Sequence, residues 1–206
     1  MGELRSEIKS MQSPYILEEH ELHATQLDIY SRLMKDRQIF FSSEVNDDTA
    51  SIVIAQLLYL DSVDQSDITM YIMSPGGSCS AGLGIIDTIG SLKSKVSTIN
   101  VGMAASMGCL IAAAGARGKR LALPNARFLI HQPLIGGHGI TGCADDIEIE
   151  ATEINKTKKK LFEFLSQRTG QPYDKIVSDA KRDNWLSAEE ALDYGLIDKI
   201  IPIKWD

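Results

Sequence analysis

Residues 101–111 read VGMAASMGCLI, and Ser106 is the one hydroxyl among side chains that are nearly all small or apolar. The β-branched run from Val96 to Val101 precedes this stretch and predicts a buried strand. The apolar run from Cys109 to Ala114 follows it and predicts a buried helix. Ser106 therefore falls where a strand gives way to a helix N-terminus. A serine at this position either caps free helix N–H groups or acts as a nucleophile whose oxyanion those groups stabilise.

The stretches before Ser106 alternate between strand and helix. Strands and helices are predicted in turn at residues 38–41, 51–60, 67–73, 81–93 and 96–101, and Asn46 to Thr49 offer N-caps for the helix at 51–60. This alternation is typical of a parallel sheet with right-handed crossovers, whose ligands bind beyond the carboxyl ends of the strands. The sequence therefore indicates an α/β fold in which the Gly76-Gly77 turn and Ser106 share one rim of the sheet.

After Ser106 the pattern changes to short strands and one long helix. Strands are predicted at residues 120–123 and 127–130, joined by a Pro124-Asn125 turn, and a final strand at 197–203. A highly charged helix runs from about Asp145 to Arg168, and its charge predicts that it projects and packs on a neighbouring subunit. Ser187 opens a capping box, and Gly195 closes the helix that follows.

The 206 residues and the ordinary apolar content predict one domain, covering 27–206, after an N-terminal arm at 1–26 that is mobile or processed. The net charge of -7 argues against a nucleic-acid partner. No apolar run reaches the roughly 18 residues that span a membrane. The arm lacks a signal-peptide core, and Cys79, Cys109 and Cys143 fit neither a disulfide framework nor a metal-binding spacing. We therefore expect a cytoplasmic protein without a metal or cofactor.

A nucleophilic serine needs a base, and the chain has four histidines. His20 and His23 fall in the polar arm, and His138 falls in a Gly-rich loop. His131 differs because it ends an apolar strand directly before Gln-Pro. If this strand neighbours the strand that leads to Ser106, His131 is the expected base.

The carboxylate that would orient the base is less well determined. Asp183 is favoured slightly, because it precedes an apolar Trp-Leu pair and a capped helix. The candidates that spacing leaves open are Asp145, Asp146, Asp174, Asp179 and Asp183.

The Gly76-Gly77 pair has two readings. It either makes a strand-to-helix turn that needs positive φ, or it also points an N–H at a reacting carbonyl oxygen. In the second case the N–H groups of Gly77 and Met107 form an oxyanion hole. No Gly-Lys-Ser/Thr follows, so a phosphate-binding P-loop is not expected.

Several motifs in a fixed order resemble the proteolytic subunits of the Clp protease family (ClpP). The resemblance covers about residues 28–201, and its segments are 28–33, 74–77, 102–108, 124–127, 130–133, 187–191 and 194–198. It implies a crotonase-like α/β spiral of ββα units, with a mostly parallel sheet and a projecting handle helix at about 145–168. It also places the nucleophile at Ser106, the base at His131, the third member of the triad at Asp183 and the oxyanion-hole amides at Gly77 and Met107.

The resemblance further implies an ATP-independent serine endopeptidase that cleaves unfolded polypeptides inside stacked heptameric rings. An AAA+ unfoldase would deliver folded substrates to it. The residues that it assigns to substrate binding are Gly76, Gln132, Pro133 and Leu134. An extended substrate would pair with the backbone there, which gives little sequence selectivity.

The chain departs from the family pattern where the unfoldase docks. Tyr71 keeps an aromatic ring, whereas Thr69 and Ser91 stand where a Tyr and a Phe are common in the family. Because aromatic side chains dominate such contacts, we expect a weakened docking site. One alternative function is therefore a regulatory or latent ring subunit that needs a second ClpP-type subunit. Another is a crotonase-fold enzyme acting on acyl-CoA thioesters.

Overall fold

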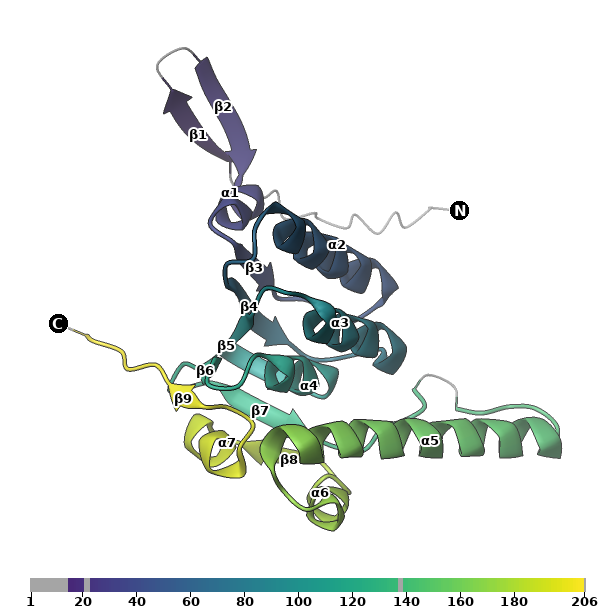
Figure 1. Cartoon of the computed structure of the whole chain (residues 1–206). Helices are drawn as coiled ribbons and strands as arrows, with labels where there is room; N and C mark the ends of the chain where they lie inside the picture. Colours follow the sequence, from purple (N-terminus) through teal and green to yellow (C-terminus); the bar gives the residue numbers. More distant parts are fainter. Residues whose placement is uncertain (1–14, 21–22, 137–138, 206) are drawn as a thin grey trace, which may run out of the picture.

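A seven-stranded sheet runs through the chain (Figure 1). The computed structural model describes residues 15–20, 23–136 and 139–205. The strands of the sheet are β3 (Gln38–Phe41), β4 (Ile68–Ser74), β5 (Val96–Ala105), β6 (Arg120–Ala122), β7 (Arg127–Ile130), β8 (Asn184–Leu186) and β9 (Lys199–Ile200). The helices are α1 (Ile29–Lys35), α2 (Asp47–Val63), α3 (Cys79–Ser91), α4 (Met107–Ala114), α5 (Ala144–Thr169), α6 (Tyr173–Asp179) and α7 (Ala188–Tyr194).

The sheet is mostly parallel, as the alternation of elements predicts. Strands β3, β4, β5, β6 and β9 neighbour one another in that order and run in parallel. Strand β7 is parallel to the last part of β5, and β8 is antiparallel to β7. The predicted strands on either side of the Pro124-Asn125 turn therefore both pair with β5, one after the other along its length. The predicted α/β class is confirmed.

Helices α2, α3 and α4 cover one face of this sheet (Figure 1). On β4 the alternate side chains Ile68, Met70 and Ile72 point to these helices and are fully buried. The side chains between them, Tyr71 and Met73, face the other side and are half-buried or exposed. A parallel sheet is normally covered on both faces. One face near β3 and β4 is therefore left partly open in the isolated chain.

Helix α5 projects from the body of the molecule (Figure 1). Only its second half packs against the core, through Leu161, Phe162 and Leu165. In its first half, Ile147 and Ile149 are 43% and 60% exposed. The predicted handle is confirmed in extent and in its projection, and its packing against a neighbouring subunit stays a prediction.

The predicted arm at 1–26 lies in part outside the described residues, namely at 1–14 and 21–22. Beside these, β1 (Tyr15–His20) and β2 (His23–Asp28) form a hairpin that stands away from the main sheet (Figure 1). One prediction at the other end of the chain is wrong. The expected final strand is shorter than predicted, because only Lys199 and Ile200 pair with β6. The predicted helix caps at Asn46, Ser187 and Gly195 are confirmed.

Candidate active site

Ser106 sits on a sharp turn between β5 and α4. Strand β5 continues beyond its predicted end, through Gly102 to Ala105. Ser106 follows this strand directly and precedes the first residue of the helix. Ser106 has φ 54° and ψ -125°, a conformation that a residue with a side chain rarely adopts. Its hydroxyl makes no capping bond to the helix, so the capping interpretation is wrong. The turn therefore presents a hydroxyl that the helix does not use.

Close backbone packing holds this strained turn in place. The N–H of Ser106 donates to the carbonyl of Leu129 on β7 at 2.9 Å. Gly76 has φ 89°, and a Cβ there would lie 2.6 Å from the Cβ of Ser106 and 2.9 Å from the nitrogen of Met107. On the helix side, a Cβ on Gly108 would lie 2.8 Å from the carbonyl oxygen of Ser74. The residues around Ser106 are small because neighbouring backbone occupies the space that larger side chains would need.

Two N–H groups beside Ser106 are free to bind an oxyanion. Met107 is the first residue of α4, where a backbone N–H has no acceptor within its own helix. Gly77 is fixed by a bridge in which Val45 donates to Gly76 at 2.8 Å and accepts from Ser78 at 2.7 Å. Within the described residues, no oxygen accepts from the N–H of Gly77 or of Met107. The predicted donor pair therefore lies on either side of the Gly76–Ser106 contact.

His131 shares a cavity with Ser106. It directly follows β7, which lies beside the end of β5, and this strand order brings the two residues to one rim. The cavity is lined by Glu44, Pro75, Gly77, Ser78, Cys79, Ser106, His131, Pro133, Leu134 and Gly136. The other histidines lie elsewhere: His20 and His23 pair across the hairpin, and His138 lies outside the described residues.

Asp183 directly precedes β8, the strand that pairs with β7. The last pair of this ladder is Ile130 with Asn184, so His131 and Asp183 are the two residues directly beyond it. Asp183 is exposed and is not part of the cavity wall. In the described part of the chain, no hydrogen bond joins Ser106 to His131 or His131 to Asp183. Catalytic hydrogen bonds are often long in the absence of substrate, so this geometry leaves the Ser–His–Asp arrangement a proposal.

Other candidate carboxylates have different partners. Asp179 accepts from the Tyr194 hydroxyl and pairs with Lys175. Burial favours a higher pKa for Asp179, but the bonds from Lys175 and Tyr194 hold that pKa below its usual value. Asp146 accepts from the backbone of Cys143 at the start of the projecting helix α5. The place of Asp183 beside the β7–β8 ladder therefore favours it over the other carboxylates more strongly than its position in the sequence does.

Of the predicted substrate residues, Pro133 and Leu134 line the cavity and Gln132 lies behind it. The Gln132 backbone donates to Ala180 at 2.7 Å, and its side chain donates to Lys181 at 3.0 Å. Lys158 of α5 donates to the Gln132 side chain at 3.1 Å. Gln132 therefore ties the segment after His131 to α5 and to the turn before β8. Gly76 uses its own N–H and C=O within the protein, bonding to Ser74 and Val45, so only its Cα could meet a substrate.

The three predicted docking residues fall on two elements. Thr69 and Tyr71 lie on the half-buried face of β4, and Ser91 ends α3 and is exposed. The Tyr71 ring lies 6.3 Å from that of Phe40, whose ring lies 6.4 Å from that of Tyr30. The sequence prediction missed Tyr30 and Phe40. The parallel register, which pairs Phe40 with Tyr71, could have revealed Phe40.

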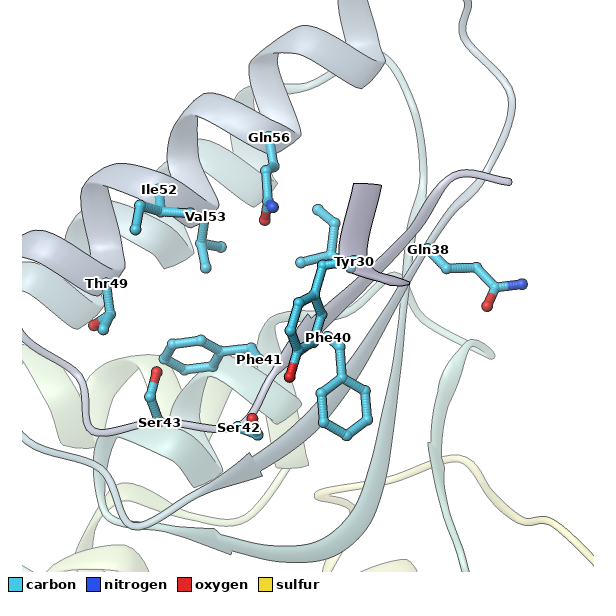
Figure 2. A pocket seen from close by; sticks show the side chains of 11 residues that line it. Tyr30, Gln38, Phe40, Phe41, Ser42, Ser43, Thr49, Ile52, Val53 and Gln56 are labelled. Atoms are coloured by element: carbon cyan, nitrogen blue, oxygen red, sulfur yellow. The ribbon is translucent and has the colours of Figure 1, made fainter. Parts of the chain in front are cut away.

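The ring of Tyr30 also borders an open pocket between β3 and α2. Figure 2 shows Tyr30 and Phe40 close together at one side of this pocket, with Ile52 and Val53 of α2 at the other. Phe40 and Ile52 are 36% and 59% exposed, so the pocket carries apolar surface out to solvent. This part of the molecule therefore offers more aromatic surface than Thr69, Tyr71 and Ser91 suggest.

Glu44, Ser78 and Cys79 are cavity residues that the sequence prediction missed. Glu44 follows the carboxyl end of β3, and Ser78 and Cys79 follow that of β4. The rule that placed Gly76 and Ser106 on one rim applies equally to these positions. Burial raises the pKa of the Cys79 thiol, so this side chain is less acidic than an ordinary cysteine.

The described residues hold no cluster of three or more His, Cys, Asp or Glu side chains suited to a metal ion. Within the same residues, none of the helices combines the length and the apolar character needed to cross a bilayer.

The fold and the site together define an α/β protein with a serine on a strained strand-to-helix turn, beside unused N–H groups and a histidine. Comparison with known proteins specifies the family. The Clp protease family model matches residues 20–204, and the chain belongs to this family. Its activity is that of a serine peptidase core.

Curated relatives agree with the family model. The chain is 53% identical over 190 residues to the ATP-dependent Clp protease proteolytic subunit of Bacteroides fragilis, and the match covers 92% of this chain and 90% of that protein. A protein of the same description from Bacteroides thetaiotaomicron is also 53% identical over 190 residues, covering 92% and 85% of the two chains. The resemblance seen in the motifs is confirmed. The relatives favour a protease core over a latent ring subunit or an acyl-CoA enzyme.

Proposed function

We propose that Ser106, His131 and Asp183 form the catalytic triad of this peptidase. His131 takes the Ser106 hydroxyl proton as its oxygen attacks the scissile carbonyl carbon, and Asp183 orients the imidazole and stabilises its charged form. The carbonyl oxygen becomes an oxyanion, which the N–H groups of Gly77 and Met107 bind.

The intermediate collapses as His131 passes the proton to the leaving amine, which leaves an acyl group on Ser106. Water, deprotonated by His131, then attacks this ester and restores the hydroxyl of the serine. No step uses a nucleotide, so hydrolysis of the peptide bond itself is ATP-independent. The observation that carries this proposal is the strained Ser106 turn, whose hydroxyl is unused by the helix and opens into the cavity of His131.

Unfolded polypeptide is the substrate that the cavity suits. One wall is a backbone turn at Gly77 and Ser78, and the other is the segment Pro133–Leu134, with Leu134 67% exposed. An extended chain laid between these walls would bond mainly through its own backbone, which only an unfolded substrate can offer.

The partners follow from the relatives' description and from two exposed surfaces. The relatives are named ATP-dependent, and we infer that an ATP-driven AAA+ unfoldase supplies substrate to this chain as well. The half-open face of β3 and β4 and the exposed first half of α5 support assembly of copies, or of related subunits, into stacked heptameric rings. Thr69, Tyr71 and Ser91 stay the proposed docking residues, with Tyr30 and Phe40 adding rings nearby. A cytoplasmic location stays a prediction from the sequence.

One experiment tests the catalytic and the assembly proposals together. Purified full-length protein is weighed by native mass spectrometry, with and without a candidate AAA+ unfoldase, and is assayed with a fluorogenic peptide. A fluorophosphonate is expected to add once per subunit, at Ser106, and to stop cleavage. Ser106→Ala and His131→Ala are expected to abolish cleavage while keeping the assembly mass.

The control is Ser51→Ala, which removes an exposed hydroxyl on α2 that is not part of the cavity wall. This variant should keep both the label and the activity. Peptide cleavage by purified Ser106→Ala would refute the nucleophile assignment. An unlabelled but active wild type would point to a different chemistry.

A further inference from the structure

Glu44 lies in the wall of the active-site cavity, against the oxyanion-hole residue Gly77. A Cβ built on Gly77 would lie 3.0 Å from the Cγ of Glu44. The backbone here is fixed on both sides: Val45 donates to Gly76 at 2.8 Å, and the carbonyl of Glu44 accepts from the Thr49 hydroxyl at 2.7 Å. Glu44 is therefore held beside the position where the scissile carbonyl would bind.

Among the described residues that line this cavity, Glu44 supplies the one carboxylate. The remaining lining residues are two serines, a cysteine, a histidine and apolar or glycine residues. Within the described part of the chain, the Glu44 carboxylate accepts no hydrogen bond and has no ion-pair partner. It is also exposed, so it has not been desolvated. A carboxylate held at a site wall without a partner can pair with a cation on a bound ligand.

We propose that Glu44 determines charge specificity, favouring peptides with Lys or Arg beside the scissile bond and disfavouring Asp or Glu there. This inference rests on the proposed function, because it places the scissile carbonyl at Gly77 and Met107. The substrate residue that passes the Gly77 wall then carries its side chain along Glu44. Because the carboxylate is exposed, the preference is modest and weakens at high salt.

The test compares quenched fluorescent peptides that differ only in Lys, Gln or Glu at one position flanking the bond. For the full-length assembly, kcat/KM should be higher for Lys than for Glu at one flanking position. Glu44→Gln, which keeps the shape of the side chain, should reduce this Lys-to-Glu ratio about three- to fivefold. Glu44→Lys should reverse it. Asp48→Asn, an exposed acid outside the cavity, should leave it unchanged.

A second readout needs no turnover. Intact mass spectrometry follows phosphonylation of Ser106 by aryl phosphonates that carry a Lys-like or a Glu-like side chain and lose the aryloxide group, and the same ratio of rates should change in Glu44→Gln. If that ratio stays at the wild-type value in both readouts, Glu44 has no role in specificity, although the proposed function stands. If wild type neither cleaves peptides nor takes up any phosphonate, the proposed function itself fails.

Discussion

The two sides of the active site are held in different ways. The Ser106 side is fixed by backbone, because Gly76 and Gly108 leave room for main chain to pack against the turn and Leu129 accepts its N–H. On the His131 side, the backbone is fixed by the β7–β8 ladder, but the His131 and Asp183 side chains make no hydrogen bond within the described residues.

This difference separates a preformed part of the site from an adjustable one. The proposed oxyanion donors and nucleophile belong to the preformed part, which needs no reorganisation when substrate binds. The proposed base and its carboxylate come from segments that Gln132 links to the projecting helix α5 through Lys158. Lys158 therefore connects the position of α5 to the segment of the proposed base.

Removing the charge of Asp183 should have the largest effect. Asp183→Asn keeps the size of the side chain but no longer stabilises a charged His131, so we expect kcat to fall by about 10³- to 10⁴-fold. Peptide cleavage measures this loss. Asp174→Asn, which changes an exposed acid on α6, should have no effect. Unchanged kcat in Asp183→Asn would show that a different carboxylate, or none, orients His131.

The second-largest loss of activity is expected from a change on the preformed side of the site. In Gly76→Ala the new Cβ would lie 2.6 Å from the Cβ of Ser106, at a φ that disfavours alanine. A displacement of about 1 Å at a nucleophile costs on the order of 100-fold, which we expect in kcat/KM. The control is Gly90→Ala, where a Cβ meets nothing within 4 Å. Full activity in Gly76→Ala, with native thermal stability, would contradict a rigid turn.

The smallest effect should come from loosening the adjustable side. Lys158→Met keeps an apolar side chain of similar length, but it loses the ammonium group that bonds to Gln132 and lies 5.7 Å from the centre of the Phe162 ring. That bond is worth about 1 kcal/mol, so we expect a loss of about three- to tenfold in kcat/KM. Lys160→Met, an exposed neighbour on α5, is the control. The rate of fluorophosphonate labelling should fall in parallel, and a loss confined to KM would contradict a role in positioning His131.

Local sequence patterns predicted most of the fold. Apolar periodicity located the elements from β3 to α4, and cap residues such as Asn46 and Ser187 located helix ends, because both signals lie within a few residues of one another. The extension of β5 through Gly102 to Ala105 was missed, because glycine and alanine have little strand preference. That segment is a strand because neighbouring strands pair with it.

The candidate site was predicted in part for the same reason. Ser106, His131 and the Gly76-Gly77 turn each follow a predicted strand. The rule that ligands bind beyond the carboxyl ends of parallel strands therefore identified them as candidates. Asp183 was favoured only slightly over the other acids, until the structure placed it directly beyond the last β7–β8 pair, at the same end of the ladder as His131. Glu44 and Lys158 gave no local signal that distinguished them from surface charges.

The order of residues alone determined the fold class, the helix ends and the identity of the small-residue turn that carries Ser106, because each depends on chemistry between near neighbours in the chain. Only the tertiary structure decided which strands lie side by side, and with them which acid lies at the His131 end of the β7–β8 ladder and which acidic side chain lies against Gly77. Those contacts join residues tens of positions apart, and the packing of the whole sheet selects them.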